Sequence, residues 1–204
     1  MGEEECKNLS LITSKTIQHK HINPGKTANM QFSKIIITSL FGLAVASPID
    51  KRTAAEIETD IATISSDLTS FNTAINAFTG SLLQALSLLT SYNTLASAIT
   101  TATSEITSTG ALAASDSATI YASVSSLTTQ ISDTLSDATA KESVVASSGY
   151  TSSVCSALST LSTDSDAFFT ALEGTIDSAY TSQVDALQAT VASGFASTIS
   201  AYGC

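Results

Sequence analysis

Hydrophobic side chains recur at alternating steps of four and three residues between Ile57 and Phe78. This spacing places them on one face of an α-helix. Thr53 followed by Glu56 is typical of the capping box that begins a helix, and Gly80 is expected to end this one. The segment is therefore predicted to be an amphipathic helix.

A second helix is predicted between Leu82 and Ile106, where the same spacing continues. Ser81 and Gln84 form a second candidate capping box. Additional leucines widen the apolar face in the first half of this segment. The helix is therefore expected either to lie at the centre of the fold or to present an apolar side to solvent.

Helical spacing resumes after a short connection rich in small residues. A third helix is expected to be capped by Ser115 or Asp116 and to end by Gly149. The spacing then runs from Val154 to Gly203 without a change of phase at Gly174. One helix of this length would measure about 75 Å, which is too long for a small domain, so a turn near Gly174 is the preferred interpretation.

These segments together predict an all-α fold, an antiparallel bundle of about five helices. No alternation with a period of two competes with this interpretation, and no proline follows Pro48. A stretch of 152 residues, 53–204, is the usual size of one domain. Ser and Thr supply 56 of these residues, so tertiary packing rather than helix propensity must hold the helices, and O-glycosylation is expected.

The N-terminal part of the chain is interpreted as a set of targeting and processing segments. Residues 30–46 combine a lysine, an apolar run and an Ala-Val-Ala site, as secretory signal peptides do. Residues 47–52 are a short propeptide that ends in a dibasic site, and the polar residues 1–29 are interpreted as an extension of the gene model. The alternatives are a translated N-terminal arm and a chance pair of basic residues. The expected location is extracellular or at the cell wall.

Charge excludes several classes of function for residues 53–204. Lys141 is the single basic side chain there against fourteen acidic ones, and histidine and arginine are absent. Binding of nucleic acid or of an anionic bilayer needs clustered basic residues. Ser-His-Asp catalysis, imidazole metal ligation and arginine clamps are excluded in the same way. We therefore expect no enzyme, no cofactor and no metal site.

Two cysteines fall in the predicted domain, Cys155 and Cys204, whereas Cys6 lies in the polar leader. An even pair in an oxidising compartment favours a disulfide. A straight hairpin with its turn at Gly174 would leave the two about 16 Å out of register, beyond disulfide reach. Either the C-terminal tail folds back or the turn is displaced; two free thiols are the alternative.

The chain resembles a known family in its signal, its dibasic pair, its helices rich in Ala, Ser and Thr, the stretch SSVCSAL at 152–158 and the terminal STISAYGC. These features are similar to those of the hydrophobic surface-binding protein A family, which includes the fungal cell-wall galactomannoproteins. The resemblance covers essentially all of residues 53–204.

This resemblance implies a secreted helical bundle that adsorbs to hydrophobic surfaces and, in some members, encloses fatty acids in a central apolar cavity. It also implies recruitment of secreted esterases as partners. The alternative is a structural or antigenic cell-wall mannoprotein without a specific ligand.

The composition of the domain fits an apolar binder as well. Leu, Ile, Val and Phe supply 35 of its 152 residues, so alanine-rich helices can leave space that a lipid tail would fill. Ordinary close packing is the alternative. The cavity-lining candidates are Phe71, Phe78, Leu86, Tyr92, Tyr121, Phe168, Phe169 and Phe195. Phe168 and Phe169 point about 100° apart on a helix, so one of them is expected to contact ligand or solvent.

Overall fold

The computed structural model describes residues 53–204, so the predictions for residues 1–29, 30–46 and 47–52 lie outside the described part of the chain. Within it the fold is all-α, as predicted. The helices are α1 (Ala54–Ala77), α2 (Leu82–Ser108), α3 (Ala114–Ala140), α4 (Glu142–Ser147), α5 (Thr151–Glu173) and α6 (Ser178–Ala201). None of the helices within residues 53–204 is both long and apolar enough to cross a membrane.

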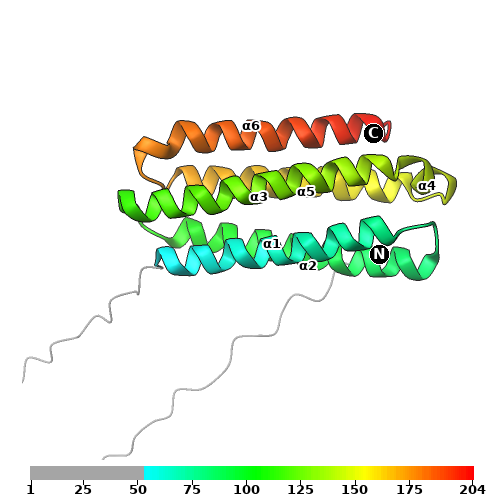
Figure 1. Cartoon of the computed structure of the whole chain (residues 1–204), viewed down its shortest axis with the longest axis horizontal. Helices are drawn as coiled ribbons and strands as arrows, with labels where there is room; N and C mark the ends of the chain where they lie inside the picture. Colours follow the sequence, from blue (N-terminus) through cyan, green and yellow to red (C-terminus); the bar gives the residue numbers. More distant parts are fainter. Residues whose placement is uncertain (1–52) are drawn as a thin grey trace, which may run out of the picture. The chain divides into compact units, whose positions relative to one another are not determined.

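The five long helices pack side by side in a closed ring. α1 contacts α2 and α3, α3 also contacts α6, α6 contacts α5, and α5 returns to α2. Consecutive long helices run in opposite directions, so α1, α3 and α6 run one way while α2 and α5 run the other (Figure 1). Each long helix therefore has two neighbours in the ring and turns its remaining apolar surface toward a shared axis.

Local sequence signals set several helix ends. The Thr53 backbone N–H donates to Glu56 Oε2 over 2.7 Å, which forms the predicted cap of α1. Gln84 accepts from the Thr79 N–H and donates to Ala77 O, so it secures the turn between α1 and α2. Gly80 in that turn has a φ of +99°, which a side chain would strain.

The third helix departs from the sequence prediction at both ends. α3 begins at Ala114 with Ala113 as its N-cap, so neither Ser115 nor Asp116 caps it. This end of α3 is bonded to the connection between α5 and α6 instead: the Leu112 N–H donates to Thr175 O, and Ser117 Oγ accepts from the Asp177 N–H. The prediction of one helix reaching Gly149 was also wrong, because the chain breaks at Lys141 and continues as the short α4.

The interior of the ring differs between its two ends. At the end where α1, α3 and α6 begin, large side chains are at most 1% exposed. They include Ile57, Ile106, Ile120, Phe169, Leu172 and Val184. This half is close-packed, and the burial of these side chains stabilises the bundle. The opposite half contains the cavity described below.

A disulfide joins Cys155 in α5 to Cys204, with their Cα atoms 5.7 Å apart. α5 ends at Glu173, near the expected turn at Gly174. The register problem is solved by a fold-back of the tail. Gly203 has a φ of +72°, and the Cys204 N–H donates to Ile199 O, which is the Schellman pattern of a helix C-terminus. The reversal brings Cys204 back toward α5.

Removing this disulfide is expected to lower stability. The bond closes a loop with a sequence separation of 49 residues, for which the chain-entropy estimate is about 4 kcal/mol. The double variant Cys155→Ala, Cys204→Ala should therefore melt about 10 °C below the oxidised protein in a circular dichroism melt. The reduced wild-type protein is the control and should melt near the variant. Equal melting of variant and oxidised protein would contradict this role.

Candidate ligand-binding cavity

A cavity of about 550 Å³ lies inside the ring at the end that carries the disulfide. All five long helices contribute to its wall, together with α4. Its lining runs from Ser152 to Ser165 along α5, which is about 20 Å at the helical rise of 1.5 Å per residue. A long-chain acyl group matches this length, and the volume is typical of ligand sites.

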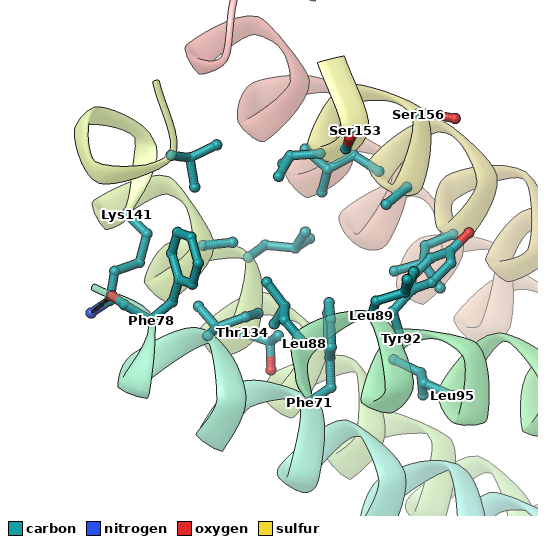
Figure 2. A pocket seen from close by; sticks show the side chains of 18 of the residues that line it. Phe71, Phe78, Leu88, Leu89, Tyr92, Leu95, Thr134, Lys141, Ser153 and Ser156 are labelled. Atoms are coloured by element: carbon teal, nitrogen blue, oxygen red, sulfur yellow. Dashed lines mark hydrogen bonds between the residues drawn. The ribbon is translucent and has the colours of Figure 1, made fainter. Parts of the chain in front are cut away.

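The mouth of the cavity opens between α2 and α5. Most of the lining residues are buried or half-buried. Those exposed to solvent are Leu89 of α2 and Ser152, Ser153 and Ser156 of α5. Figure 2 shows Ser153 and Ser156 on the α5 side, with Leu89 and Tyr92 on the α2 side. The site is therefore an apolar chamber with hydroxyl groups along one edge of its entrance.

Four of the eight residues proposed from the sequence line this cavity: Phe71, Phe78, Tyr92 and Phe195. Phe71 and Tyr92 pack with their ring centroids 6.5 Å apart, from α1 and α2. Phe78 meets Tyr150 edge to face, with centroids 6.0 Å apart. These aromatic contacts bring residues distant in sequence together at the wall.

The other four proposed residues lie elsewhere. Leu86 is 53% exposed on the outside of α2, and Tyr121 packs against Tyr180 at the junction of α3 and α6. Phe168 and Phe169 are both buried, with their rings edge to face 5.7 Å apart. Neither ring is exposed to solvent and neither lines this cavity, so the expectation that one of the pair contacts solvent is wrong.

The candidates named from the sequence were large residues and did not include the small side chains that leave the space unfilled. Ala85, Ala138 and Ala157 line the cavity. The buried side chains of Thr134 and Ser165 line it as well. Each stands at a position of the helical spacing that faces the axis, where a larger side chain would occupy the chamber. A search of the inward-facing positions for small residues would have found this signal.

Lys141 lies at the edge of the cavity, but its ammonium group is already bound. Nζ donates to Asn76 O over 2.8 Å and to Phe78 O over 3.4 Å. These carbonyls end α1, where a cation also offsets the negative end of the helix dipole. Asn76 donates to Asp137 Oδ2, and this bond, with those from Asn72 and the charge of Lys141, holds the pKa of Asp137 below its usual value. Lys141 therefore joins α1 to the break between α3 and α4.

Tyr202, the residue that follows α6, closes the same end of the chamber. Its hydroxyl donates to Ala138 O in α3 over 2.7 Å, and the side chain is buried. Burial, with a smaller effect from the Glu142 carboxylate, raises the pKa of Tyr202 to about 12. The phenol thus stays neutral and bonded throughout the physiological range.

Comparison with known proteins identifies the family. The family model for hydrophobic surface binding protein A matches residues 54–174, which is more than half of the chain. The chain belongs to this family. No curated protein sequence matches it.

Solved structures of similar fold contain lipid. The crystal structure of AFMP4P in complex with palmitic acid is 31% identical, with a TM-score of 0.72, and the match covers 74% of this chain and 99% of that one. Ligand-binding domain 1 of the Penicillium marneffei MP1 protein, complexed with arachidonic acids, is 18% identical with a TM-score of 0.69, over 74% and 99% of the two chains. Domain 2 of that protein, complexed with multiple arachidonic acids, is 19% identical with a TM-score of 0.70, and the match covers 75% of this chain and 97% of that one. The last two matches support the fold alone.

Alkaline titration of Tyr202 is expected to destabilise the protein. The folded-state pKa of Tyr202, about 12, exceeds the ordinary value of 10.0, so the neutral phenol contributes to the stability of the fold. This contribution is complete below pH 10 and is lost as the pH rises toward 12. Tyr202→Phe removes the hydrogen bond and should cost about 1 kcal/mol at neutral pH. Urea unfolding at intervals from pH 7 to 12 should show the difference between wild type and variant shrinking above pH 10. A constant difference would contradict the assignment.

Proposed function

We propose that residues 53–204 form a non-catalytic binding domain for a long-chain fatty acid, with the acyl chain inside the ring of helices. The observation that carries this proposal is the chamber of about 550 Å³, with an apolar wall and a mouth open to solvent. An unfilled apolar interior weakens a fold, and an acyl chain would restore the missing contacts. The complex of the 31% identical relative AFMP4P with palmitic acid supports the ligand class.

The carboxylate of the ligand would stay at the mouth. Lys141 already donates to carbonyls of α1, so neutral donors must bind the head group. Ser152, Ser153 and Ser156 are exposed at the entrance and carry hydroxyl donors. A carboxylate there also keeps part of its hydration, whereas a charge deep in the apolar chamber would lose it.

We propose further that this binding protein is secreted. The disulfide between Cys155 and Cys204 supports an oxidising compartment. The signal-like segment 30–46 supports export. Cell-wall association, O-glycosylation and the recruitment of secreted esterases stay predictions from composition and family resemblance. The chamber favours a ligand-binding role over the alternative of a wall mannoprotein without a ligand.

Palmitate should raise the melting temperature of the delipidated protein, because an acyl chain in the chamber binds the folded state alone. At a ligand concentration 100 times the dissociation constant the gain is about 2.7 kcal/mol, or about 5 to 10 °C for a domain of this size. Differential scanning fluorimetry with and without palmitate measures this shift. An unmoved midpoint at saturating palmitate would contradict acyl binding in the chamber.

Variants of α5 separate the chamber from nonspecific adsorption. Ala157 lines the cavity, and Ala167 is exposed on the same helix. Ala157→Leu should reduce the palmitate-induced shift in melting temperature, and Ala157→Phe should reduce it further. The ligand-free melting temperature of both variants should stay at or above that of the wild type, because the added atoms fill empty space. Ala167→Leu and Ala167→Phe are the matched controls and should leave the shift intact. Equal effects at both positions would argue against the chamber as the site.

Export predicts a particular N-terminus. Protein collected from the culture medium should begin at Thr53, or at Ser47 if the pair Lys51-Arg52 is not cleaved. N-terminal sequencing decides between these two. Secreted protein that begins at Met1 or Gly2 would refute the interpretation of the leader.

A further inference from the structure

An exposed apolar strip lies directly beside the mouth of the cavity. Within residues 53–204, the large hydrophobic side chains that stand most open to solvent all belong to the first half of α2. They are Leu82 at 65%, Leu83 at 77%, Leu86 at 53% and Leu89 at 52% exposure, and they are called the leucine face below. A contiguous apolar patch of this kind usually marks a contact surface.

The leucine face is continuous with the chamber. Leu82, Leu86 and Leu89 follow the four- and three-residue spacing of one helix face. Leu89 is both exposed and part of the cavity wall, next to Ala85 and Leu88, which also line it. An acyl chain that leaves the mouth on the α2 side therefore meets leucine side chains on the outer surface.

The surroundings of the mouth carry little charge. Between Leu82 and Ser104 helix α2 has no charged residue, and Glu105 stands four turns beyond Leu89. On the opposite edge, α5 has no charge before Asp164. A surface that must be dehydrated on contact is easier to bury when it lacks ions.

We propose that the leucine face rests on the surface of an uncharged lipid assembly and holds the cavity mouth against it, so that a fatty acid passes between assembly and chamber without crossing water. This inference rests on the proposed function. Within residues 53–204, fourteen acidic side chains against the single Lys141 oppose an anionic lipid surface, which leaves a neutral one as the partner. The exposed leucine side chains then enter the apolar layer and gain free energy in proportion to their buried area.

A second copy of the chain fits this face less well. The exposed surface of the four leucines equals that of about two and a half fully exposed leucine side chains. A stable dimer interface buries roughly 800 Å² and involves 20 to 30 residues on each partner. A lipid surface has no such minimum, because it adapts its shape to the side chains that enter it.

The test replaces two residues that are exposed and do not line the cavity. Leu83→Gln with Leu86→Gln keeps the helix propensity of α2 while removing apolar area. Ala186→Gln with Ala189→Gln on the exposed side of α6 is the matched control. Co-flotation with phosphatidylcholine vesicles measures association, and a fluorescent long-chain fatty acid in those vesicles reports the rate of transfer to protein.

In the leucine variant, vesicle association and the rate of fatty-acid transfer from vesicle to protein should both fall by roughly tenfold or more, because two leucines no longer enter the lipid. Its palmitate affinity in solution should stay within about twofold of the wild type, as the chamber is unchanged. The control should match the wild type in both measurements. Wild-type association should weaken when anionic phosphatidylserine replaces part of the phosphatidylcholine.

Other results would overturn the inference. Unchanged association and transfer in the leucine variant, with normal palmitate affinity, would reject the leucine face while leaving the proposed function intact. A wild type that sediments as a dimer, with a monomeric leucine variant, would assign the face to a second copy. A wild type that binds vesicles through the leucines but takes up no palmitate would instead reject the proposed function and keep the lipid contact.

Discussion

No helix lies on the axis of this bundle, because each of the five long helices packs against two neighbours in a closed ring. Helices in contact stand about 9 Å apart, so the centre of a ring of five lies about 8 Å from each helix axis, whereas a helix with its side chains extends about 5 to 6 Å. Side chains at the inward positions must therefore be large enough to fill the axis, or a void remains. Both outcomes occur in this domain, one at each end.

The two ends are consequently held together in different ways. Isoleucine, leucine and phenylalanine meet at the closed end and stabilise it by burial. Around the chamber the buried apolar side chains line a wall instead of filling the axis, and bonds of defined geometry also join the elements. The disulfide ties the tail to α5, Tyr202 bonds α6 to α3, and Lys141 bonds the break after α3 to the end of α1. A cavity can persist because these links resist collapse of its wall.

The charge pattern of the domain decides how such a chamber can recognise a ligand. Its single cation is occupied by backbone carbonyls, so an ion pair with a carboxylate is not the main source of affinity. Burial of apolar surface and neutral hydroxyl donors remain, and both depend weakly on salt. The uncharged strip of α2 beside the mouth is consistent with a ligand that arrives from a lipid phase rather than as an ion from water.

The sequence by itself determined the helical class, the cap at Thr53 and Glu56, and the acidic, histidine-free composition of residues 53–204, and it favoured the turn near Gly174 and the pairing of Cys155 with Cys204. These follow from periodicity, local hydrogen bonds, cysteine number and composition, which act within a few residues or need no geometry. The tertiary structure alone decided the break at Lys141, the order of helices around the ring, and which apolar residues border empty space. An inward-facing position has the same sequence pattern whether its side chain packs against a neighbour, as that of Phe168 does, or borders a cavity, as that of Phe71 does. The difference depends on side chains brought from other helices, and their placement is a property of the whole ring.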